Sequence, residues 1–224
     1  MENVIEISHS IERKGFLKKV YFHLLLAIIG FTGLEYLWFT TPVADSVLNF
    51  IEGQRWIFII GAFMLASWIA TRLSESESKA MQYLGLAGYT LAESLIFIPL
   101  LHIAQYKTGS DIIATAGYIT VISFISLTAI VFLTNVNLVG WGKYILWSGV
   151  VALSVIVCSP FIGFNLGVVF SAMMVCLAGI AILYDTSMII HHYEDRAYVG
   201  ASLRLFASIA MLFWYVSSIL NRKD

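Results

Sequence analysis

Charged side chains are scarce in this chain. Only 12% of the 224 residues are Asp, Glu, Lys or Arg, against roughly a quarter in ordinary soluble domains. No acidic or basic residue occurs between Tyr144 and Tyr184, and 59% of the chain is hydrophobic. So few charges cannot coat the surface of a soluble protein of this size. The composition therefore predicts a polytopic membrane protein whose surface faces lipid.

The chain also lacks an excess of one sign of charge and has little cysteine. A net charge of -1 excludes the basic field that attracts nucleic acid. The two cysteines, Cys158 and Cys176, both lie in apolar runs, and no CxxC pair occurs. We expect buried packing thiols here, because neither a disulfide framework nor a metal site is indicated by this spacing.

Several catalytic signatures are missing. No lysine occurs between Lys143 and Lys223, which excludes a retinal-type Schiff base in the last two apolar runs. Gly-x-Ser-x-Gly, HExxH and Walker motifs are absent. One polar turn holds four potential ligands without the spacing of a metal site, namely His191, His192, Glu194 and Asp195. We therefore expect no enzymatic activity, no catalytic residue, and no resident metal or cofactor.

Seven apolar runs are long enough to cross a bilayer, which takes about 20 helical residues. They span residues 20–41, 56–72, 83–104, 112–134, 143–159, 161–190 and 198–220. The connections between them are short, so we expect one all-α bundle of seven transmembrane helices over 20–220. Residues 1–19 mix acids and bases and are expected to form a short cytoplasmic segment.

The distribution of Lys and Arg over the ends of the runs predicts the orientation. With the N-terminus inside, the inner segments hold eight basic residues and the outer segments four. The inner ones are Arg13, Lys14, Lys18, Lys19, Arg72, Lys79, Lys143 and Arg196, and the outer ones are Arg55, Lys107, Arg222 and Lys223. The count favours a cytoplasmic N-terminus, and seven spans then place the C-terminus outside.

Four ionisable residues lie inside the runs, where a charge is costly and normally faces the bundle interior. They are Glu35, Glu93, Asp185 and Arg204. Asp185 and Arg204 stand at similar distances from the polar turn 191–197, so antiparallel helices bring them to similar depth. Ser208 is four residues after Arg204 and therefore shares its helical face, one turn deeper.

Two interpretations of Asp185 stay open. Either Asp185 forms a structural ion pair with Arg204 or Arg72, or it is a titratable gate or cation ligand that lines a pathway. Glu93 either pairs with Arg204 or is a neutral acid. Glu35, near the outer end of the first run, is expected to be an interfacial carboxylate.

The residues around Asp185 form a pattern that extends through the last two runs. It comprises Tyr184-Asp185-Thr186, Ile189-Ile190, Tyr198, Ala201, Leu205-Phe206, Ser208 and Phe213. This pattern resembles the C-terminal signature of the Bax inhibitor family, the transmembrane Bax-inhibitor-motif proteins with their bacterial YccA/YetJ branch. Looser likenesses in KKVYFHLLLA (18–27) and GLAGYTLAESL (85–95) extend the resemblance over essentially the whole chain.

The resemblance implies a pH-influenced cation leak channel, for calcium or protons. In one set of relatives, two acids from the last two spans share a proton and an arginine on the second span latches the pore. By position, Asp185 matches the first acid and Arg72 the latch, while Ser208 replaces the second acid. We expect Arg204 to supply a fixed positive partner for Asp185 instead. A transient calcium ion would be held weakly at Asp185, because a single carboxylate offers few oxygen ligands.

The serine at position 208 is similar instead to the YccA-type branch, whose members bind and restrain a membrane-anchored AAA protease. The alternative function is therefore a non-conducting regulator of such a protease, and a purely structural scaffold is a third. Our first expectation is ion leak across a bacterial inner membrane. The expected partners are the lipid bilayer and a permeating cation, and the expected pathway residues are Asp185, Arg72, Arg204, Ser208 and Glu93.

Overall fold

The computed structural model confirms an all-helical membrane protein. It describes residues 2–52, 55–108, 111–163 and 166–222, with side chains from Arg13 onward except at 107–108. The helices within these ranges are α1 (Glu2–Thr40), α2 (Val43–Phe50), α3 (Trp56–Ser74), α4 (Lys79–Ile103), α5 (Asp111–Thr134), α6 (Gly142–Cys158), α7 (Val168–His191) and α8 (Tyr198–Leu220). A π-helical turn, η1 (Ala104–Thr108), extends α4, and a 3-10 turn, η2 (Val139–Trp141), precedes α6.

Seven helical segments in the described part of the chain are long and apolar enough to cross a bilayer. Each coincides with one of the seven predicted runs, which confirms the fold class. Two boundaries differ from the prediction. The first helix begins at Glu2 rather than near residue 20, and the sixth span begins at Val168 rather than 161. Pro160 and the positive φ of Gly163 hold the apolar residues between them in a turn, which hydropathy alone does not reveal.

The short helix α2 was not predicted from the sequence. Its eight residues lie between the first two spans, where we expected only a connection. A segment this short gives too few turns for a helical pattern to be recognised. The end of α5, in contrast, has a clear local cause. Asn135 adopts a left-handed φ of 51° directly after the helix and terminates it, as asparagine commonly does.

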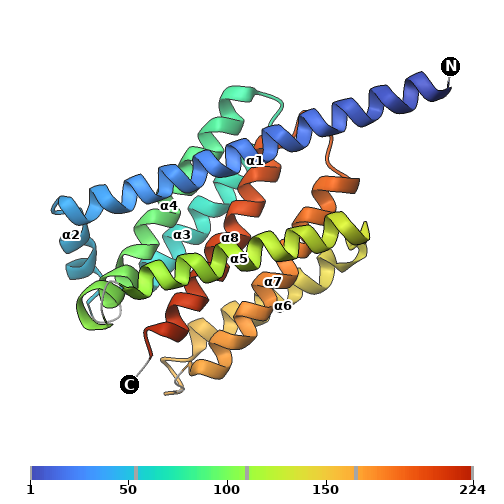
Figure 1. Ribbon diagram of the computed structural model, residues 1–224. Coiled ribbons are helices and arrows are strands. Elements are labelled where there is room, and N and C mark those ends of the chain that lie inside the picture. Colours follow the sequence, from blue (N-terminus) through green and yellow to red (C-terminus); the bar gives the residue numbers. More distant parts are fainter. Residues whose placement is uncertain (1, 53–54, 109–110, 164–165, 223–224) are drawn as a thin grey trace.

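Helix α8 forms the centre of the bundle. It packs against α1, α3, α4, α5 and α7, and Figure 1 shows it crossing behind α1 and α5, with α3 and α4 on one side and α6 and α7 on the other. Its side chains Val199, Leu205 and Leu212 are buried in the main apolar cluster. Helix α6 lies at the periphery and packs mainly on α7. A polar residue on α8 is therefore surrounded by protein on most sides.

Three connections and the first half of α1 meet at one end of the bundle, here called the turn end. The connections are 75–78, 135–141 and 192–197. Lys79 Nζ donates to the Arg196 carbonyl at 3.1 Å, and the ring Nε2 of His191 lies 3.0 Å from Asn135 Oδ1. Arg13 of α1 donates to the Ile189, Ile190 and Tyr193 carbonyls. Arg13 thereby satisfies carbonyl groups that the end of α7 leaves free, and fastens α1 to this end.

Both cysteines depart from the sequence prediction. Cys158 and Cys176 are exposed on the outer surfaces of α6 and α7, and Cys176 lines an apolar groove between these two helices. We expected buried packing thiols, which is wrong. In a bilayer the outer surface of a bundle is as apolar as its core, so an apolar context does not distinguish the two locations.

Candidate functional site

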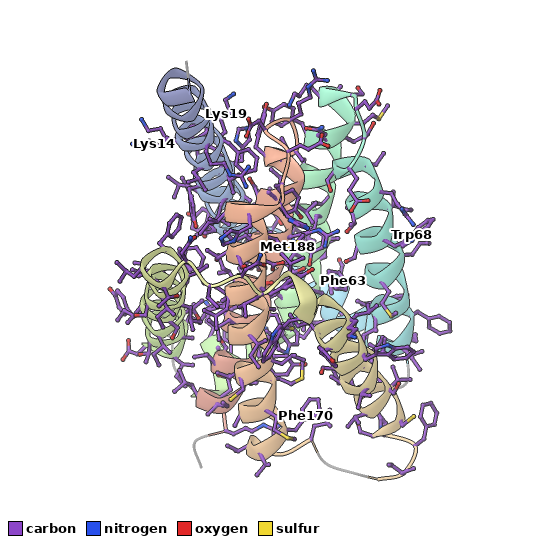
Figure 2. The ribbon with its side chains drawn as sticks, turned by 90° about the vertical axis from the view of Figure 1, so that its right-hand side faces the viewer. Lys14, Lys19, Phe63, Trp68, Phe170 and Met188 are labelled. Carbon is purple, nitrogen blue, oxygen red and sulfur yellow. The ribbon has the colours of Figure 1, made fainter. Side chains whose placement is uncertain are left out.

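A cavity of about 640 Å³ lies between α3, α4, α6, α7 and α8. Its walls come from the first half of α3 and of α7 and from the second half of α8, so it extends from mid-bundle toward the end opposite the turn end. Figure 2 shows Phe170, one of its lining residues, near that opposite end, with Lys14 and Lys19 near the turn end. Most of the lining is apolar. The polar groups at its inner, mid-helix limit are Glu93 of α4 and Ser208 of α8.

Asp185 lies directly beyond this inner limit. Ser208 Oγ donates a hydrogen bond of 2.5 Å to Asp185 Oδ2, and both residues are buried, at 8% exposure each. The carboxylate therefore points toward protein and not toward acyl chains. The sequence placed Asp185 at the depth of Arg204, whereas the structure joins it to Ser208, one turn deeper along the same face of α8.

The expected ion pair of Asp185 with an arginine is wrong. Among the residues that the structure describes, no Lys, Arg or His nitrogen lies within 4 Å of its carboxylate. Arg204 instead places Nη2 2.9 Å from Glu75 Oε1, and Arg72 Nη1 lies 4.0 Å from Glu75 Oε2. The Arg204 charge acts on Asp185 only at longer range. Glu75 stands just past the end of α3, where it stays half-exposed, so an ion pair there avoids the desolvation that a pair with buried Asp185 would cost.

Tyr193 lies near both sets of polar groups. The charged groups that act on its hydroxyl include Arg204, Asp185 and Glu75. Burial raises the pKa of Tyr193 to about 12, although the nearby Arg204 charge opposes that shift. The phenol therefore stays neutral at physiological pH.

Glu75 is positioned by two close helix contacts that sequence reasoning missed. A Cβ added at Gly85 of α4 would lie 2.6 Å from the Ala70 carbonyl, and one added at Gly200 of α8 would lie 3.0 Å from the Ser74 carbonyl. Both glycines allow neighbouring backbones to approach the last turn of α3. The spacing of Gly85 and Gly200 carries no local signal, because their partners lie on another helix.

The two remaining acids are both buried. Glu93 is 6% exposed, and its Oε2 has no hydrogen-bond partner among the described residues. Of the two alternatives for Glu93, the pair with Arg204 does not form, because Arg204 binds Glu75. Glu35 is 7% exposed on α1, so the expectation of an interfacial carboxylate is wrong. Within the described residues no group of three or more His, Cys, Asp or Glu side chains is arranged to hold a metal ion.

These features define a polytopic helical membrane protein with a half-bundle cavity that ends at a buried carboxylate. The family described as "Inhibitor of apoptosis-promoting Bax1" matches residues 13–224. The chain therefore belongs to the Bax inhibitor family, as the residues around Asp185 predicted.

Similar proteins come from bacteria and from a virus. The Modulator of FtsH protease YccA of Escherichia coli is 25% identical, over 99% of this chain and 98% of that protein. The Golgi anti-apoptotic protein of vaccinia virus is 25% identical, over 93% and 86%. An uncharacterised protein of Neisseria meningitidis serogroup A is 23% identical, over 96% and 92%. These relatives have nearly the same length as this chain, which agrees with a shared whole-chain fold.

Proposed function

We propose that this Bax inhibitor family protein conducts a slow leak of cations, calcium or protons, across its membrane. The observation that carries the proposal is the buried Asp185 carboxylate, held by Ser208 at the inner limit of a cavity that runs through half of the bundle. A buried acid within a membrane span that faces protein is the usual mark of an ion or proton pathway. We propose no enzymatic activity and no resident cofactor.

Within this proposal the cavity brings the cation to mid-membrane. Glu93 and Ser208 supply oxygen atoms at its inner limit, and Asp185 supplies the charge directly beyond. One carboxylate with few other oxygens binds calcium weakly, which suits passage rather than storage. Asp185 is the single acid of its pair, whereas the resemblance implied two carboxylates that share a proton. Its partner Ser208 donates a hydrogen bond but does not titrate, so no proton is shared between two acids.

The turn end is closed in this structure, which supports a gate on that side. The fully buried side chains Val199, Leu205 and Ile189 fill the bundle between Asp185 and the turn end. Beyond them Glu75 joins α3 to α8 through Arg204 and receives Arg72 as well. We propose that Arg72 and Arg204 act as latches through Glu75, and not through Asp185.

The proposal is tested by reconstitution of the purified protein in liposomes that contain a calcium dye, with a proton-sensitive dye in a second set. Flux faster than in protein-free vesicles, and dependent on pH, is expected. Flux equal to that of empty vesicles at every pH would show that the protein does not conduct.

Glu75→Gln is expected to raise the leak about two- to fivefold. The amide keeps the size of the side chain but removes the charge that attracts both arginines, and half-exposed ion pairs contribute roughly 0.2–1 kcal/mol. Initial rates of dye response in liposomes measure the change. Glu77→Gln is the matched control, because Glu77 lies two residues further along the same turn and forms no ion pair with a described side chain. Equal rates in the two variants would argue against a latch at Glu75.

A second candidate function rests on the likeness to the Modulator of FtsH protease YccA along nearly the full length of both chains. In that case the protein binds a membrane-anchored AAA protease and conducts nothing. Purification from detergent-solubilised membranes of its own host, with a tag on the chain, is expected to retain such a protease if this is correct. A retained protease together with flux equal to empty vesicles would favour the regulator.

We place the protein in a bacterial inner membrane with its N-terminus in the cytoplasm. The relative in Escherichia coli O6:H1 is named Inner membrane protein YccA. The turn end carries the eight basic residues that the sequence assigned to the inner side, which supports this orientation under the positive-inside tendency.

A further inference from the structure

Two lysines from different helices converge on one tyrosine ring at the turn end. Lys79 Nζ of α4 lies 4.0 Å from the centre of the Tyr198 ring, and Lys19 Nζ of α1 lies 5.5 Å from it. Tyr198 begins α8, so three helices meet here. Neither lysine forms an ion pair with any carboxylate whose side chain is described, and the first turns of α4 and α8 contain no acidic residue. Among the described side chains, therefore, no carboxylate lies within ion-pair distance of either ammonium group.

Hydrogen bonds beneath the lysines orient the remaining polar groups inward. His23 Nδ1 lies 2.7 Å from the Lys19 carbonyl, which only accepts, so Nδ1 carries the hydrogen. The other ring nitrogen, Nε2, lies 3.1 Å from the Tyr83 hydroxyl oxygen. The Tyr83 and Tyr198 hydroxyl oxygens lie 3.4 Å apart. These polar groups contact one another within the protein, whereas the Lys19 and Lys79 side chains are exposed, and Lys79 also donates to the Arg196 carbonyl.

An apolar surface continues from the lysines toward mid-membrane. Phe22 and Leu26 follow Lys19 at three and seven residues, so they share its face of α1, and both are exposed. A ligand that places an anion at the lysines therefore meets hydrocarbon-compatible side chains on the membrane side, as a phospholipid requires.

We propose that Lys19 and Lys79 bind the phosphate of an anionic phospholipid above Tyr198, with its acyl chains along the exposed apolar side chains of α1 that follow Lys19. Lysine is a common phosphate ligand and its flexible stem lets both charges reach one group. The bound lipid would tie α1 to α4 and α8 at the turn end. This site is separate from the cavity and does not depend on conduction.

The test measures lipid retention by native mass spectrometry of the full chain in detergent. Wild-type protein is expected to retain phosphatidylglycerol in preference to phosphatidylcholine. In Lys19→Gln/Lys79→Gln the apparent affinity for phosphatidylglycerol is expected to fall about 30-fold, since each basic residue near an anionic lipid surface contributes roughly fivefold. The double Lys→Arg variant keeps the charge and is expected to keep most of the binding.

Lys14→Gln/Lys18→Gln is the matched control, because it removes the same charge from exposed positions of the same helix. The affinity of this control variant for phosphatidylglycerol is expected to stay close to that of the wild-type protein. Equal retention of phosphatidylglycerol by both double-Gln variants would overturn the site. Inorganic phosphate is the final comparison: competition by millimolar phosphate would mean that the lysines hold a soluble anion, which overturns the lipid assignment.

Discussion

Asp185→Asn is expected to lower cation flux in liposomes about 10- to 100-fold and to leave the fold intact. The amide has nearly the same shape and its oxygen still accepts the hydrogen bond from Ser208, while the charge that attracts a cation at mid-membrane is lost. A charged hydrogen-bonding partner contributes roughly 1.5–3 kcal/mol, which corresponds to this range of rates. Initial rates of calcium entry at several pH values, at equal protein content per vesicle, give the measurement.

Asp111→Asn serves as the control for this variant. Asp111 is exposed in the first turn of α5, so its neutralisation removes one acid without touching the cavity. Flux through Asp111→Asn is expected to equal that of wild type. If Asp185→Asn conducts as wild type does and elutes as a folded protein, Asp185 is not the ligand and the leak mechanism proposed here is wrong.

Gly85→Ala is expected to destabilise the protein by about 1–3 kcal/mol, the usual cost of overpacking a well-packed contact. The new Cβ would lie 2.6 Å from the Ala70 carbonyl and 2.8 Å from the Ser74 backbone nitrogen. Both neighbours are backbone atoms of α3, so relief requires that α3 and α4 separate. Thermal unfolding in detergent, followed by circular dichroism, is expected to show a midpoint several degrees lower.

Gly88→Ala offers a control within the same helix. A Cβ at Gly88 meets no atom within 4 Å, so the substitution tests helix propensity without a clash. Alanine is favoured over glycine in a helix interior by roughly 0.5–1 kcal/mol, and a small gain in stability is expected. If the unfolding midpoint of Gly85→Ala equals or exceeds that of Gly88→Ala, the α3–α4 contact tolerates a side chain at Gly85.

The membrane class and the place of Asp185 were accessible to sequence reasoning. Seven apolar runs identify seven spans because bilayer thickness sets helix length, independently of how the helices pack. Equal distances from the turn predicted that Asp185 lies at the depth of Arg204, within one turn of its observed partner Ser208. The depth of a residue in the membrane follows from its position along its own helix, so it can be estimated by counting residues from the end of that helix.

Counting residues along the chain did not predict which side chain pairs with each charged residue. Arg204 and Ser208 share one face of α8, yet Ser208 binds Asp185 and Arg204 binds Glu75. The long arginine stem allows its head to reach the aqueous end of α3, where solvation of the ion pair is largely kept. Glu75 reaches that position only because Gly85 and Gly200 allow α3 to pack closely against two other helices.

The sequence by itself thus determined the family signature and the seven spans, because the thickness of the bilayer sets the length of each apolar helix. Only the tertiary structure decided that the cavity ends at Ser208 and Glu93, that both arginines turn to Glu75, and that Lys19 and Lys79 meet at Tyr198. Those contacts depend on the rotation and separation of helices that are far apart in the chain, which packing sets and local sequence does not.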